Sequence, residues 1–158
     1  MTTFAGDFDA RGRRFAVVAA RFNEVIVGPL VDGALACLAK HGVGAEDVDI
    51  AWTPGAFELP FAARRFAVSG GYDAVICLGA VVRGETPHFE YVAGEAARGI
   101  SDASRDSGVP MIFGVLTTET MAQARDRAGG KHGNKGWDAA MAAMEMASLL
   151  ERLPKREG

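Results

Sequence analysis

The stretch Phe15-Ala16-Val17-Val18-Ala19-Ala20 decides the fold, because it is apolar throughout and does not alternate with polar residues. Such a run is typical of a strand buried on both faces, as in a parallel sheet covered by helices on each side. We therefore predict a central strand here. Apolar residues then recur at helical spacing from Ile26 to Leu38, and Gly42 can take the left-handed position that ends a helix.

The same alternation of strand and helix continues along the chain. Further strands are predicted at 48–52, 74–78 and 109–116, and further helices at 59–68, 87–107, 120–128 and 136–153. This order predicts a three-layer α/β/α sandwich, in which a four-stranded parallel, flavodoxin-like sheet carries helices on both faces. We expect one domain over residues 1–158, with peripheral tails at 1–12 and 154–158. The short N-terminal segment is alternatively available to pair with a neighbouring subunit.

The composition indicates a soluble globular protein of ordinary polarity. Hydrophobic residues make up 49% and charged residues 23% of the 158 residues, and the net charge is −3. Since no broad positive field results, we expect no nucleic-acid and no membrane partner. The first nine residues carry no apolar signal region, and no apolar run reaches bilayer length, so we expect a cytoplasmic protein. Cys37 and Cys77 lack metal or redox spacing and are predicted to be buried free thiols.

Four segments with binding-type residues follow the predicted strands. Because the carboxyl ends of parallel strands share one edge of a sheet, these segments are expected to line one ligand site. They are residues 21–23, 53–58, 79–88 and 114–118.

The stretch Arg83-Gly84-Glu85-Thr86-Pro87-His88 is the strongest candidate for an active-site edge. Thr86 is a plausible N-cap and Pro87 suits the first helical position, so free backbone N–H groups can hold an anion such as phosphate. His88 then lies in the first helical turn, where an imidazole can transfer protons. An exposed capping-turn histidine explains the same pattern, and position alone leaves both roles open.

Other residues allow both a binding and a structural role. Phe22 and Phe113 can stack on a planar heterocycle or belong to the core, and Glu58 can bind a ligand or cap a helix. The segment 129–136 is not a Walker A motif, because a glycine follows Lys135, and it is predicted to be a flexible connector. Possible phosphate ligands around it are Arg127, Lys131 and Lys135. The last helix is apolar beyond the needs of a monomer, which indicates subunit packing.

Together, four stretches of the chain strongly resemble the 6,7-dimethyl-8-ribityllumazine synthase family. They are Ala20-Arg21-Phe22-Asn23, Pro54-Gly55-Ala56-Phe57-Glu58-Leu59-Pro60, Gly79-Ala80-Val81-Val82-Arg83-Gly84-Glu85-Thr86-Pro87-His88-Phe89 and Gly133-Asn134-Lys135-Gly136. The resemblance spans nearly the whole chain, and its order and spacing are more specific than any one motif.

The resemblance implies an enzyme of riboflavin synthesis. It would condense 5-amino-6-(D-ribitylamino)uracil with 3,4-dihydroxy-2-butanone 4-phosphate and need no cofactor or metal. His88 would move protons, and Phe22 would stack on the pyrimidine. Residues implied to hold the ring edges and ribityl chain are Ala56, Phe57, Glu58, Ala80, Val81 and Val82, and those implied to bind phosphate are Gly84, Glu85, Thr86 and Arg127.

The same resemblance implies a site shared between subunits. Phe113 and Arg127 would come from the neighbouring subunit of a pentamer. The family often has glutamate, thought to orient the histidine, where this chain has Asp138. The compact connector 129–136 favours a shell of sixty subunits, and riboflavin synthase is a possible further partner. Competing interpretations are an archaeal-type riboflavin synthase and a noncatalytic flavin-binding or shell-forming paralogue.

Overall fold

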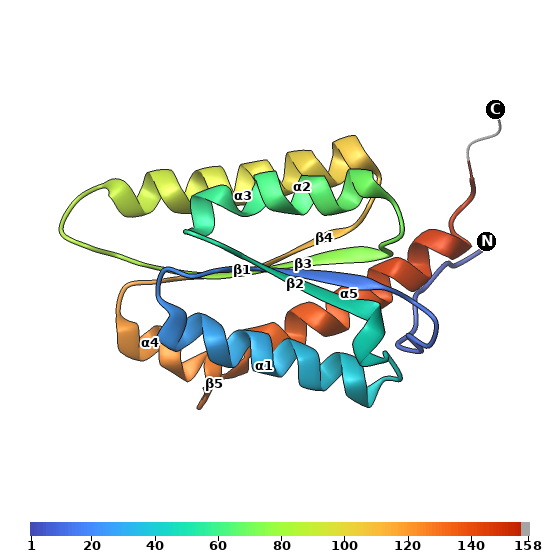
Figure 1. Ribbon diagram of the computed structural model, residues 1–158, viewed down its shortest axis with the longest axis horizontal. Coiled ribbons are helices and arrows are strands. Elements are labelled where there is room, and N and C mark those ends of the chain that lie inside the picture. The colour runs from blue at the N-terminus through green and yellow to red at the C-terminus, as the bar shows by residue number, and fades with distance from the viewer. Residues whose placement is uncertain (156–158) are drawn as a thin grey trace.

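A parallel sheet runs through the centre of the molecule (Figure 1). The computed structural model describes residues 1–155. Strands β1 (Phe15–Ala20), β2 (Val48–Thr53), β3 (Ala74–Val82) and β4 (Met111–Thr118) pair in parallel in the order β2-β1-β3-β4. The predicted four-stranded parallel sheet is confirmed.

Helices cover both faces of this sheet (Figure 1). One face carries α2 (Leu59–Ser69) and α3 (His88–Ser107), and the other carries α1 (Glu24–Lys40), α4 (Met121–Asp126) and α5 (Lys135–Arg152). Short 3-10 helices, η1 (Ala45–Asp47) and η2 (Ala56–Glu58), precede β2 and α2. The three-layer sandwich is therefore confirmed. No helix within residues 1–155 is long and apolar enough to cross a membrane.

The central strand β1 packs against the helix layers on both faces of the sheet. Val17 belongs to the core between the sheet and the α1/α5 layer, whereas Val18 belongs to the core beneath α2 and α3. Every residue of β1 is at most 1% exposed. Burying one such valine contributes about 1.5–3 kcal/mol, so the uninterrupted apolar run stabilises both layers at once.

Several strand boundaries differ from the sequence prediction, most of all the end of β3 and the two ends of β4. β3 continues to Val82, so residues 79–82, expected to form a loop, are paired with β4 from Gly79↔Val115 to Val82↔Thr118. β4 begins at Met111 and not at residue 109, because Pro110 has no N–H and contributes only its carbonyl, which accepts from the N–H of Val75 at 2.9 Å. Pairing with β4 thus decides where β3 ends, and the missing N–H of Pro110 decides where β4 begins.

The predicted cap of α3 is wrong by one residue. The helix begins at His88, Pro87 occupies the cap position, and no side chain caps this end. Pro87 has φ −70° and ψ 3°, and its carbonyl accepts the N–H of Glu90 at 3.0 Å. This local turn, not a Thr86 hydroxyl, starts the helix.

The connector before α5 is ordered, which corrects the expectation of a flexible loop. β5 (Ala128–Gly130) and β6 (Gly133–Asn134) form a small antiparallel hairpin. Asn134 Oδ1 accepts the N–H groups of Gly136 and Trp137 at 2.8 and 3.1 Å, and its Nδ2 donates to the carbonyl of Pro29 at 3.0 Å. A Cβ at Gly136 would lie 1.8 Å from the Leu30 carbonyl oxygen, so glycine lets α1 and α5 touch.

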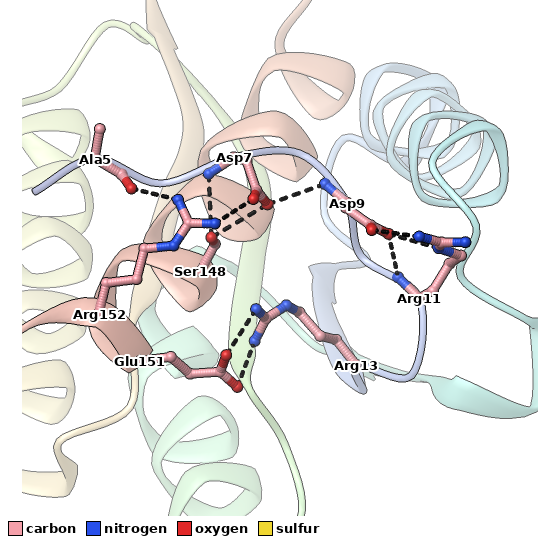
Figure 2. Close-up of polar contacts among 8 residues, drawn as sticks. All are labelled: Ala5, Asp7, Asp9, Arg11, Arg13, Ser148, Glu151 and Arg152. Atoms are coloured by element: carbon pink, nitrogen blue, oxygen red, sulfur yellow. Dashed lines mark hydrogen bonds and ion pairs between the residues drawn. The ribbon is translucent and has the colours of Figure 1, made fainter.

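The N-terminal segment runs along α5 without forming a strand (Figure 2). The N–H of Asp7 donates to Ser148 Oγ at 3.1 Å, and its carboxylate pairs with Arg152, which also donates to the carbonyl of Ala5 at 2.6 Å. Arg13 pairs with Glu151 at 2.9 Å. Ala5, Asp7 and Arg13 are thus held against α5 of their own chain by polar contacts. Residues 156–158 of the predicted C-terminal tail lie outside the described residues.

Candidate active site

A cleft of about 710 Å³ opens at the carboxyl ends of β1, β2 and β3, beside the start of α3. This edge is where a parallel α/β sheet places its ligands. Ten of the residues expected in the site line the cleft: Phe22, Ala56, Phe57, Glu58, Ala80, Val81, Val82, Gly84, Thr86 and His88.

The turn after β1 presents Phe22 to this cleft. Its N–H donates to the Pro54 carbonyl at 3.0 Å, and its side chain is 71% exposed. The next residue, Asn23, is the only non-glycine residue with positive φ among residues 1–155, at 63°. Asn23 Nδ2 donates to the carbonyl of Ala80 in β3 at 2.8 Å. This bond ties the Phe22 turn to the floor of the cleft, a role that the sequence analysis did not assign.

The turn after β2 supplies the opposite wall. Thr53 Oγ1 donates to the carbonyl of Gly55 at 2.8 Å and orders the entry into η2. Ala56 is buried, whereas Phe57 is 58% exposed. Glu58 lines the cleft and also occupies the cap position of α2, although its side chain forms no cap hydrogen bond. The structure thus leaves the Glu58 carboxylate available for a ligand.

The end of β3 and the start of α3 complete the cleft. Gly84, Thr86 and His88 line it, whereas Glu85 is not among its lining residues. Tyr91 and Val92 of α3 also face it, three and four residues after His88. The sequence analysis missed them, although this helical spacing places them on the His88 face.

A second hollow, of about 560 Å³, is lined by the remaining predicted residues except Glu85, which lines neither surface. Phe113, Arg127, Lys135 and Asp138 lie here, on β4 and on the elements that follow it. Glu119, Gln123 and His132, which the sequence analysis did not select, share the lining.

Arg127 is oriented toward the second hollow by its own chain. Arg127 Nη1 donates to the Gln123 carbonyl at 3.1 Å, and the Arg127 carbonyl accepts the N–H of Lys135 at 2.8 Å. Phe113 is 38% exposed. A fixed guanidinium beside an exposed ring suits a ligand that is both planar and anionic.

The predicted set is therefore divided between two surfaces of one subunit. His88 belongs to the first cleft, and Arg127 and Asp138 belong to the second hollow. Within residues 1–155, the structure therefore does not bring these groups into one cleft.

The two cysteines stay outside this chemistry. Cys37 and Cys77 are free and buried, as predicted. Burial is the main cause that raises the pKa of Cys37 to about 11 and that of Cys77 to about 12. Neither thiol is therefore a source of thiolate nucleophile at neutral pH.

Comparison with known proteins gives one consistent family. A family model described as 6,7-dimethyl-8-ribityllumazine synthase matches residues 12–151. Relatives of the same name from two Clostridium kluyveri strains are each 52% identical over 153 residues, covering 97% of this chain and 99% of the relative. A de novo designed Rossmann fold protein is similar at a TM-score of 0.38 and 16% identity, covering 71% of this chain and 90% of that one. The fold assignment rests on the strand order and not on that weak similarity.

Proposed function

The chain belongs to the 6,7-dimethyl-8-ribityllumazine synthase family, and we propose that its active site forms between two subunits, from the cleft of one and the hollow of the next. As a member, it is a transferase that condenses 5-amino-6-(D-ribitylamino)uracil with 3,4-dihydroxy-2-butanone 4-phosphate, the penultimate step of riboflavin synthesis. Phosphate and water leave. The observation that carries the proposal is the division of the expected site residues between two surfaces.

The first cleft suits the ribitylaminouracil. Phe22 is held by backbone and side-chain bonds around it and is exposed enough to stack on a pyrimidine. The η2 turn, with Ala56, Phe57 and Glu58, and the β3 end, with Ala80, Val81 and Val82, bind the ring edges and the ribityl hydroxyls. Phe113 of the neighbouring subunit covers the ring.

The phosphate of the second substrate is bound where the two surfaces meet. Gly84, Glu85 and Thr86 present backbone and hydroxyl groups beside the first turn of α3, whose dipole favours an anion. Arg127 of the neighbouring subunit supplies the positive charge, with Lys135 in support. These contacts tighten as phosphate leaves and its charge grows, which lowers the barrier to elimination.

His88 is the proton-transfer group. The substrate amine attacks a carbonyl to form an imine with loss of one water, phosphate is eliminated, and the ribitylamino nitrogen closes the ring with loss of a second water. Each step moves protons but needs no protein nucleophile, which agrees with the buried thiols. Holding two reactive substrates together supplies much of the rate. Asp138 of the neighbouring subunit orients His88 through its carboxylate, directly or through a water molecule. The aspartate side chain is one methylene shorter than the glutamate that the family often has at this position.

The assembly proposed for this chemistry is a pentamer, packed into a shell of sixty subunits in the cytoplasm. Exposed aromatic rings on both surfaces, such as Phe22 and Phe113, favour burial against another copy. Each subunit acts as one domain over residues 1–158 with peripheral ends at 1–12 and 154–158, and residues near the N-terminus are available to pair with a neighbour. Riboflavin synthase, which consumes the product, is the proposed partner.

Mixing the protein with both substrates tests the proposal. We expect lumazine absorbance and inorganic phosphate to rise in equal amounts, without added metal or cofactor. An archaeal-type riboflavin synthase and a noncatalytic paralogue would both change neither signal, and in a second assay only the riboflavin synthase would consume added lumazine.

A further inference from the structure

Arg83 links the end of β4 to the start of α3. Its backbone N–H donates to the Thr118 carbonyl at 2.9 Å, which adds one bond to the β3/β4 ladder beyond Val82↔Thr118. Its Nε lies 2.8 Å from Glu119 Oε2. Arg83 therefore binds Thr118 through its backbone and Glu119 through its side chain.

Glu119 is itself fixed by a tight turn. Its N–H donates to Gln123 Oε1 at 2.9 Å, and Thr120 and Gln123 form a reciprocal capping box at the start of α4. The Gln123 carbonyl accepts from Arg127 at 3.1 Å. Glu119, which binds Arg83, thus belongs to the same hydrogen-bonded turn as Gln123, which binds Arg127.

On its other side, Arg83 contacts the two residues that follow His88. The guanidinium carbon lies 4.7 Å from the centre of the Phe89 ring, and Nη1 lies 3.6 Å from Glu90 Oε1. Arg83 is absent from the lining of the first cleft, whereas Phe89 belongs to it. These contacts close the segment 84–87 into a loop whose two ends are both held by Arg83.

We propose that Arg83 is a positioning residue for His88 and for the phosphate-binding segment 84–86, an inference that rests on the proposed function. No side chain caps α3, so the contacts of Arg83 with Phe89 and Glu90 are what hold its first turn against the end of β4. The ion pairs are largely exposed and add little stability. Their effect is geometric, because a displacement of about 1 Å at a reacting group can cost about 10²-fold in rate.

The test compares Arg83→Gln with the unmodified protein. We expect kcat to fall about tenfold or more and KM for the phosphate substrate to rise, with KM for the pyrimidine unchanged, because only the α3 start is displaced. The double variant Arg83→Glu/Glu119→Arg should recover part of the lost kcat. Arg98→Gln, which removes the Arg98–Glu95 pair within α3, is the matched control and should behave as the unmodified protein.

A second readout does not depend on turnover. Hydrogen exchange at the amides of residues 84–90 should be faster in Arg83→Gln than in the unmodified protein or in Arg98→Gln. Unchanged exchange and unchanged kinetics would overturn the inference, as would equal losses for both substrates without rescue by the double variant. An unmodified protein that makes no lumazine would overturn the proposed function, while the exchange measurement would still decide the role of Arg83.

Discussion

His88 and Arg127 lie in different hollows of the same subunit, His88 at the first residue of α3 and Arg127 directly after α4. The two side chains follow neighbouring strands, β3 and β4, yet they line separate surfaces. This separation is the reason for proposing that the active site forms where two subunits meet.

Replacing His88 with alanine should slow turnover and leave the assembly intact. Loss of a proton-transfer group typically costs about 10²–10⁴-fold, and the lower end is expected because substrate positioning remains. Steady-state kinetics measures the loss, and light scattering checks the particle mass. Unchanged kcat would remove His88 from the mechanism, and a changed mass would show a structural role.

Arg127→Ala should weaken use of the phosphate substrate more than binding of the pyrimidine. A hydrogen bond to a charged group contributes about 1.5–3 kcal/mol, so KM for the phosphate substrate should rise about tenfold or more. Arg125→Ala is the matched control, because Arg125 is an exposed arginine of α4 outside the second hollow. Equal effects on both substrates, or an equal effect of the control, would contradict the phosphate role.

At Asn23, alanine should destabilise the protein more than glycine. Both substitutions remove the bond to the Ala80 carbonyl, which contributes about 1 kcal/mol. Only alanine adds the strain of the left-handed conformation, about 1–2 kcal/mol more. Denaturant unfolding of the two variants measures the difference, and an alanine variant as stable as the glycine variant would refute it.

The N-terminal contacts should weaken in acid. A hydrogen bond from Arg11 is the largest of the effects that lower the pKa of Asp9 to about 2, and those from Arg152 and Arg13 likewise lower the pKa values of Asp7 and Glu151. Because these carboxyl pKa values are lower in the folded protein than in the unfolded chain, the pairs stabilise the fold at a pH above the unfolded pKa values, near 3.8 for aspartate and 4.5 for glutamate. They lose that effect as the pH falls below these values toward the folded pKa values.

Asp7→Asn tests this pH dependence. The variant should be less stable than the unmodified protein at neutral pH, and the two should converge as the solution is acidified, as followed by denaturant unfolding. Asp32→Asn, at an exposed position of α1, is the control and should show no such convergence. A gap between Asp7→Asn and the unmodified protein that widens in acid would contradict the assignment.

The fold was predictable because its signals are local. The apolar run of β1 requires cover on both faces, and Gly42, at φ 94°, follows α1 where the sequence predicted its end. The hairpin of β5 and β6 was missed, since its pairing involves only a few small residues and Asn134 contacts α1 from afar.

The candidate site was only partly predictable. Motifs in sequence identified His88 and Arg127, but periodicity cannot tell which hollow a residue after a strand will line. Asn23 and Arg83 belong to segments that the sequence placed at the site, but their positioning roles were missed because they depend on contacts with Ala80 and Glu119, residues 57 and 36 positions away. The roles of all the predicted site residues, Glu85, Lys135 and Asp138 included, stay predictions that the kinetics of their variants can test.

Complementation between two impaired variants, assayed well below the KM for the phosphate substrate, tests the shared site most directly. His88→Ala and Arg127→Ala chains, unfolded together and reassembled in equal amounts, should regain activity well above either variant alone. With random mixing in a closed ring, roughly a quarter of the interfaces would combine an intact His88 with an intact neighbouring Arg127. Activity that never exceeds the mean of the two separate variants would place both residues in a site within one chain and contradict the account.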